Sequence, residues 1–73
     1  MEDKKILKEA IKTRGETQGA IAKRMGILQS AMSMNMTRDR MSLDMFRRIL
    51  SETGYDVCVV DRESGEVKWT VTD

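Results

Sequence analysis

Histidine is absent from this chain, and cysteine occurs only once, at Cys58. Histidine is the commonest acid-base catalyst near neutral pH and the commonest zinc ligand, so its absence removes the first candidate for both kinds of site. A single cysteine forms no internal disulfide and is far short of a metal cluster. We therefore expect no catalytic residue, no metal site and no cofactor, and we do not expect an enzyme.

Long apolar runs are also absent. No stretch approaches the roughly 20 apolar residues of a transmembrane helix, and residues 1–5 lack the apolar core of a signal peptide. These absences predict a cytoplasmic protein that does not bind membranes. A chain of 73 residues buries only about 60% of the surface that its unfolded form exposes. Such a small core by itself favours a dimer.

The sign of the charge changes along the chain. Residues 1–54 carry eleven Lys and Arg against seven Asp and Glu, a net charge of +4, whereas residues 55–73 carry two against five, a net charge of −3. The basic part suits a surface that faces nucleic acid, and the acidic part suits an appendage. This asymmetry supports double-stranded DNA as a partner.

Apolar residues at helical spacing predict two helices in the first part of the chain. The first helix is expected over residues 4–14, with Asp3 as its N-cap and Gly15 as its end. Thr17 is expected to cap the second helix, and Gly26 to end it in a left-handed turn. The residues expected to face inward are Ile21, Ala22, Met25 and, after the turn, Ile27.

Two more helices are expected before Gly54, where the hydrophobic period changes. In the third, Met32 and Met36 form the inner stripe, so core filling explains these methionines better than a methionine-rich binding groove. After a polar connection over residues 37–41, Ser42 is expected to cap a fourth helix that Gly54 ends. The expected core face of that helix is Leu43, Phe46, Ile49 and Leu50.

Beyond Gly54 the hydrophobic period changes to two, which predicts a β-hairpin with its turn over residues 61–65. One face would be apolar throughout, and Cys58 and Val60 leave the other partly apolar. Because an isolated two-stranded hairpin is marginal in water, we expect the first face to pack on the helices and a partner copy to pair with an edge or the second face. Trp69 would be an anchor over the helices or across the dimer seam. The predicted first face is Val57, Val59, Val67, Trp69 and Val71, and the predicted dimer interface adds Cys58 and Val60.

Several short residue pairs stand in a characteristic order within residues 17–50. They are Thr17-Gln18, Ile21-Ala22, Gly26-Ile27, Gln29-Ser30 with Met32-Ser33, and the stretch from Met41 to Leu50. Through these residues about half of the chain resembles the Cro/C1-type (XRE family) helix-turn-helix proteins, and in particular small phage-like or mobile-element regulators. The resemblance implies a four-helix DNA-binding domain over residues 1–54. With the hairpin that the periodicity predicts over residues 55–73, we expect a mainly α fold in which the hairpin belongs to the same compact unit and dimerises it.

Two positions depart from the family pattern. The residue before the third helix is usually a capping Ser or Thr, whereas this chain has Leu28, and losing such a cap costs about 1 kcal/mol. The outer face of the third helix usually carries longer polar or basic side chains, whereas this chain has Ser33 and Met34. Fewer hydrogen bonds to bases are then available, so specificity would depend more on Gln29 and on DNA shape.

The resemblance also implies roles for individual residues. The third helix would enter the major groove, and residues around it would grip the backbone. Arg47 and Arg48 are instead expected on a solvated helix face. The implied base contacts are Gln29, Ser30, Ser33 and Met34, and the implied phosphate contacts are Thr17, Gln18, Thr37, Arg38 and Arg40.

Two functions remain open at this point. The first is a sequence-specific regulator of transcription, most simply a repressor that binds an inverted-repeat operator as a homodimer. The second is an antitoxin or anti-regulator that keeps the helical scaffold and binds a protein partner through the edge of its hairpin. The modest charge and the uncharged outer face of the third helix allow either function.

Overall fold

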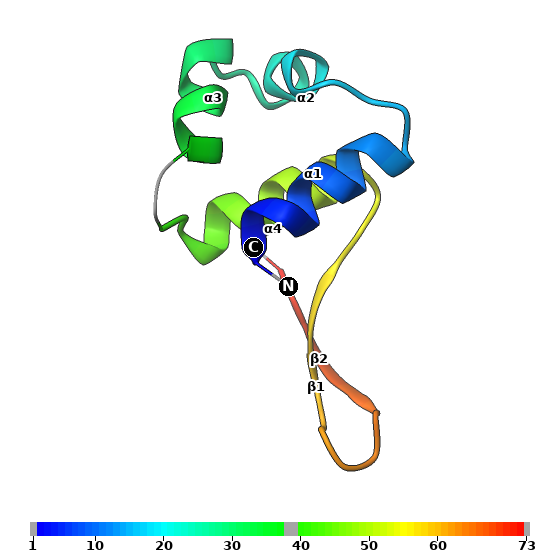
Figure 1. Ribbon diagram of the computed structural model, residues 1–73. Coiled ribbons are helices and arrows are strands. Elements are labelled where there is room, and N and C mark those ends of the chain that lie inside the picture. The colour runs from blue at the N-terminus through cyan, green and yellow to red at the C-terminus, as the bar shows by residue number, and fades with distance from the viewer. Residues whose placement is uncertain (1, 38–39, 73) are drawn as a thin grey trace.

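The computed structural model describes residues 2–37 and 40–72, which form four helices followed by a two-stranded antiparallel hairpin (Figure 1). The mainly α fold expected from the sequence is thereby confirmed. The helices make one body and the hairpin extends from it, so the molecule measures 40 × 24 × 22 Å. The elements are α1 (Asp3–Thr13), α2 (Gln18–Met25), α3 (Gln29–Thr37), α4 (Leu43–Glu52), β1 (Val57–Val60) and β2 (Val67–Val71).

Each helix contributes one fully buried side chain to the centre of the core. These four are Leu7, Ile21, Met32 and Ile49, all 0% exposed. The inward faces predicted for α2 and α3 are therefore confirmed, since Ala22 and Met36 are buried as well and Met25 and Ile27 pack against the core. The other buried apolar residues of the described chain are Ala10, Ile11 and Leu50.

The prediction for Leu43 was wrong. We expected it on the core face of α4, but it is 59% exposed. Leu43 is the first residue of α4, and helical side chains lean toward the N-terminus. Its side chain therefore extends past the end of the helix instead of over the core. Phe46, one turn later, packs partly buried against the core.

The helix ends follow the predicted chemistry, with one exception. Thr17 Oγ1 accepts a hydrogen bond from Ala20 N–H at 3.1 Å, and Ser42 Oγ accepts one from Met45 N–H at 3.1 Å. Asp3, predicted as an N-cap, is instead the first residue of α1, and its Oδ1 accepts from Lys4 N–H at 2.7 Å. The cap position belongs to Glu2, whose side chain forms no cap hydrogen bond.

The register of the hairpin confirms most of the predicted apolar face. Val57 is opposite Val71 and Val59 is opposite Trp69, so these four residues share one face. A bulge follows Val59 and leaves Lys68 without a partner, which brings Val67 opposite Val60. The side chain of Val67 therefore lies on the opposite face of the hairpin from that of Trp69, and the prediction that Val67 belongs to the first face was wrong.

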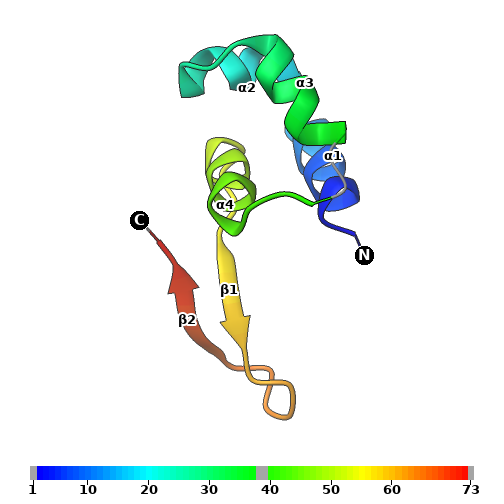
Figure 2. The ribbon, with the colours of Figure 1, turned by 90° about the vertical axis from the view of Figure 1, so that its left-hand side faces the viewer.

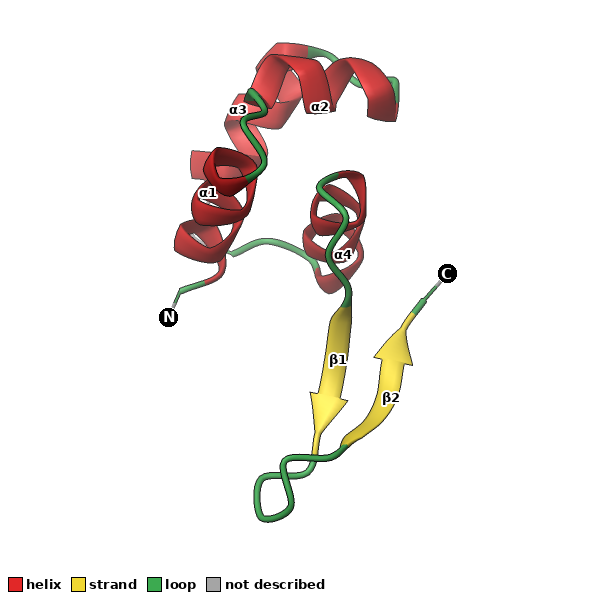
Figure 3. Ribbon diagram, turned by 90° about the vertical axis from the view of Figure 1, so that its right-hand side faces the viewer, coloured by secondary structure: helices red, strands yellow, loops and turns green. Residues whose placement is uncertain are grey.

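The expectation that this face packs on the helices was wrong. The hairpin points away from the helical body (Figures 2 and 3), and Trp69 is 69% exposed. Only its base is partly covered, where Tyr55 and Val57 pack against the core. The reason is the direction in which the chain leaves α4, since β1 continues outward from the end of that helix.

Within the described residues, no helix has the length and apolar character that crossing a membrane requires.

Candidate nucleic-acid interface

A glycine turn joins α2 to α3. Gly26 has φ +73°, a left-handed conformation that strains residues with a side chain. The Ile27 N–H donates to the Ala22 carbonyl at 3.0 Å, which closes the turn. Because Ile21 and Met32 are also fully buried in the shared core, α2, the turn and α3 form one packed unit.

The N-terminus of α2 presents free amide groups beside two of the predicted phosphate contacts. Thr17 caps the helix, and Gln18 is its first residue. The cap oxygen binds the Ala20 N–H, so the N–H groups of Gln18 and Gly19 precede the first intrahelical hydrogen bond and have no acceptor within the helix. Such amides favour an anion.

The side chain of Gln29 lies over Gly19. A Cβ atom built on Gly19 would be 3.4 Å from Oε1, 3.5 Å from Cδ and 3.6 Å from Nε2 of Gln29. The amide group of Gln29 therefore lies just beyond the space that a side chain on Gly19 would begin to fill. This places the first residue of α3, a predicted base reader, close to the first turn of α2, where phosphate contacts were predicted.

The outer face of α3 is exposed. Ser30 and Ser33 are exposed, and Met34 is 56% exposed. Thr37 is also exposed, and its Oγ1 donates to the Met34 carbonyl at 3.1 Å. The four predicted base readers, Gln29, Ser30, Ser33 and Met34, thus all lie on α3 with their side chains accessible.

Two arginines after α3 were predicted to contact phosphates, and the structure describes one of them. Arg40 is exposed, as a phosphate contact requires. Arg38 lies outside the described residues.

The outer face of α3 carries no charge, as the sequence indicated. Residues 25–37, which include all of α3, contain no charged side chain. Arg24, the last basic residue before them, is engaged by carboxylates, since its Nη1 lies 3.2 Å from Glu16 Oε1 and its Nε lies 3.3 Å from Glu52 Oε2. The hydrogen bonds that Arg24 donates to these carboxylates, first that to Glu16, raise the pKa of Arg24 above its ordinary value. The basic excess of the N-terminal part is therefore not concentrated on α3.

Arg47 also differs from its prediction. We expected it on a solvated face with Arg48, but its side chain is only 11% exposed, and its Nη2 lies 3.1 Å from Asp44 Oδ1. The long hydrocarbon stem of arginine packs readily along a protein surface, which accounts for the burial. Arg48 is exposed, as expected.

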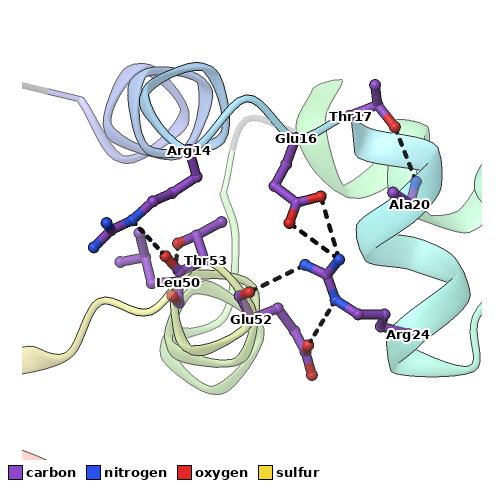
Figure 4. A network of polar contacts seen from close by, with 8 residues as sticks. All are labelled: Arg14, Glu16, Thr17, Ala20, Arg24, Leu50, Glu52 and Thr53. Atoms are coloured by element: carbon purple, nitrogen blue, oxygen red, sulfur yellow. Dashed lines mark hydrogen bonds and ion pairs between the residues drawn. The ribbon is translucent and has the colours of Figure 1, made fainter.

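The C-terminus of α4 is capped by two arginines to which sequence reasoning gave no role (Figure 4). Arg14 Nε donates to the Thr53 carbonyl at 2.9 Å, and Arg24 Nη2 donates to the Glu52 carbonyl at 3.1 Å. Free carbonyls and a partial negative charge at a helix C-terminus favour such cations. The last turn of α4 has no basic residue of its own. In the sequence, only this lack indicates that cations from other elements could cap the helix.

A polar depression of about 260 Å³ lies between α2 and α4. None of the predicted DNA contacts lines it. Three of its lining residues are arginines, but Arg24 and Arg47 are paired with carboxylates. The lining residues are Arg24, Met25, Arg47, Arg48, Ser51 and Glu52.

Comparison of the chain with protein-family models, with characterised proteins and with solved structures found no match.

Proposed function

We propose that this protein is a cytoplasmic, sequence-specific DNA-binding regulator of transcription that acts as a homodimer, most simply as a repressor. The observation that supports the proposal is the position of the Gln29 amide beside Gly19, which puts the N-terminal ends of α2 and α3 next to each other. Thr17 and Gln29 are exposed there, and Gln18 is half-buried. That surface has no carboxylate on α3 to repel phosphates. The family resemblance of residues 17–50 supports the same function.

In this proposal α3 enters the major groove and α2 braces it against the backbone. The Gln29 amide pairs with the edge of adenine, Ser30 and Ser33 add single hydrogen bonds, and Met34 contacts a thymine methyl group. The backbone is held outside the groove by uncharged and basic groups. These phosphate contacts are the N-terminus of α2 with Thr17 and Gln18, and then Thr37, Arg38 and Arg40.

The second copy would bind through the hairpin. Val59 and Trp69 on one face are 48% and 69% exposed, and Val60 and Val67 on the other face are 51% and 55% exposed. Large exposed apolar side chains mark an interaction surface. In the proposed dimer a two-fold axis through the paired hairpins relates the two α3 helices. The expected operator is an inverted repeat with half-sites about 34 Å apart.

Binding selection from random DNA, followed by two variants, tests this function. Gln29→Ala should weaken binding to the selected operator by about 1 to 3 kcal/mol and leave binding to random DNA unchanged. Arg40→Ala should weaken binding to both by a similar factor and reduce the dependence of affinity on salt. Fluorescence polarisation at several salt concentrations measures both effects. Equal losses on operator and random DNA in Gln29→Ala would show that Gln29 does not read bases.

The second candidate function is a protein-interaction module, an antitoxin or anti-regulator. The uncharged face of α3 and the exposed hairpin favour it, since a strand edge can bind another protein by strand addition. Under this alternative, the random-DNA selection recovers no sequence, and a tight partner protein occupies the hairpin. An affinity for DNA that is insensitive to salt would also count against the regulator.

A further inference from the structure

The hairpin is joined to the helical body through a short junction. The Gly54 N–H donates to the Ser51 carbonyl and the Tyr55 N–H donates to the Leu50 carbonyl, both at 3.0 Å. Gly54 has φ +85°, so this is a glycine-dependent helix end that turns the chain out of α4. Because most of the hairpin beyond Val57 is exposed, its direction depends on this junction.

Arg14, the C-cap residue of α1, contacts the residues on both sides of Gly54. Its Nε donates to the Thr53 carbonyl at 2.9 Å (Figure 4). Its guanidinium carbon lies 4.4 Å from the centre of the Tyr55 ring, and a cation at that distance attracts the face of an aromatic ring. One side chain thus holds the junction by a hydrogen bond and by a cation–π contact.

We propose that Arg14 is a positioning residue that sets the direction of the hairpin relative to the helices, and thereby the separation of the two α3 helices in the dimer. The first part depends only on the contacts of Arg14. The second part rests on the proposed function. The planar guanidinium suits the role, because it offers a directed donor in its own plane and a flat face to the ring.

The length of the hairpin gives this contact its effect. A strand of five residues spans about 16 Å, so a rotation of roughly 10° at the base moves the tip by about 3 Å. Two copies joined through their hairpins carry this change to both α3 helices. Half-sites on DNA are spaced in steps of about 3.4 Å per base pair, so a displacement of this size alters which spacing fits.

Distance measurements between two spin labels test the role of Arg14 without DNA. One label is placed on Glu63→Cys, an exposed position in the hairpin turn, in a chain in which Cys58→Ser removes the native thiol, and the other on Lys23→Cys, an exposed position of α2. Labelled protein is diluted with unlabelled wild-type protein, so that only distances within one chain are observed. The wild type should give one narrow distribution, and Arg14→Ala should give a distribution roughly twofold wider.

Arg24→Ala is the matched control. It also removes an arginine that donates to a carbonyl at the end of α4, but none of its recorded bonds reaches residues 54–57. Its distribution should stay as narrow as that of the wild type. An unchanged width in Arg14→Ala, or equal broadening in both variants, would overturn the proposal. If Arg14→Ala does not fold, Arg14→Lys replaces it, since lysine keeps the charge but lacks the planar fork, and broadening is expected there as well.

A second measurement tests the consequence for DNA. Operators with half-site spacings that differ by single base pairs are compared for wild type and Arg14→Ala. The wild type should prefer one spacing, and the variant should lose that preference while binding an isolated half-site unchanged. A preserved preference overturns the link to spacing. If the wild type binds no DNA at all, the proposed function fails, while the label distances still decide whether Arg14 positions the hairpin.

Discussion

Gly19 shows how a single missing side chain shapes this molecule. Glycine within a helix is unfavourable because its backbone loses the most freedom on folding. At Gly19, however, the amide of Gln29 lies where a larger side chain would extend. The space beside Gly19 admits a side chain no larger than alanine while the first turn of α2 and the first residue of α3 keep these positions, and both belong to the surface that we propose for DNA.

Gly19→Ala should nevertheless stabilise the protein. The added Cβ would meet the Gln29 amide at 3.4 to 3.6 Å, an ordinary contact distance. Replacing a helical glycine by alanine gains up to about 1 kcal/mol, which urea unfolding can measure. Gly26→Ala is the control, because its φ of +73° should make alanine destabilising by about 1 kcal/mol or more. A loss of stability in Gly19→Ala would mean that Gln29 cannot yield at all.

At the scale of elements, α3 begins with a residue whose side chain has no group that could cap a helix. The Met32 N–H donates to the Leu28 carbonyl at 3.0 Å, which makes Leu28 the residue in the cap position. Its hydrocarbon side chain accepts no hydrogen bond and is 75% exposed. The corresponding positions of α2 and α4 carry Thr17 and Ser42, whose oxygens both accept one. The stability of α3 therefore depends on Met32 and Met36 in the core.

Leu28→Ser should supply the missing cap. Little apolar burial is lost at so exposed a position, and a capping serine contributes about 1 kcal/mol. Thermal unfolding should show the gain. Leu43→Ser is the matched control, since Leu43 is 59% exposed but follows a cap that Ser42 already provides. An equal gain in both variants would mean that the stabilisation comes from removing exposed leucine and not from capping α3.

At the scale of the whole molecule, the main feature is the separation of a packed helical body from an exposed hairpin. The core side chains are all helical, while the hairpin exposes Trp69 and three valines. Two-stranded hairpins have marginal stability in water without further packing. A second copy that covers this surface would bury the exposed residues and complete the fold.

Trp69→Ser should therefore convert a dimer into a monomer. Burying a tryptophan dominates the energy of many interfaces, and Trp69 is the most exposed of the large apolar side chains of the described hairpin at 69%. Sedimentation at several protein concentrations measures the association. Leu43→Ser removes an apolar side chain that is comparably exposed but lies on α4, and it should leave the dimer intact. Unchanged association in Trp69→Ser would exclude this face from the interface.

The sequence alone determined the local elements of this protein. Caps at Thr17 and Ser42, the left-handed turn at Gly26 and the inward methionines of α3 were all predicted correctly. Each depends on contacts within a few residues or on the helical period, and both can be recognised from the order of the residues alone.

Only the tertiary structure decided how these elements meet. The position of Gln29 beside Gly19, the burial of Arg47 and the capping of α4 by Arg14 and Arg24 join residues that are distant in the sequence or depend on the packing around them. The direction of the hairpin was predicted incorrectly for the same reason. Alternation of apolar residues shows that a strand has an apolar face, but the surface that this face meets depends on the angle at which the chain leaves α4.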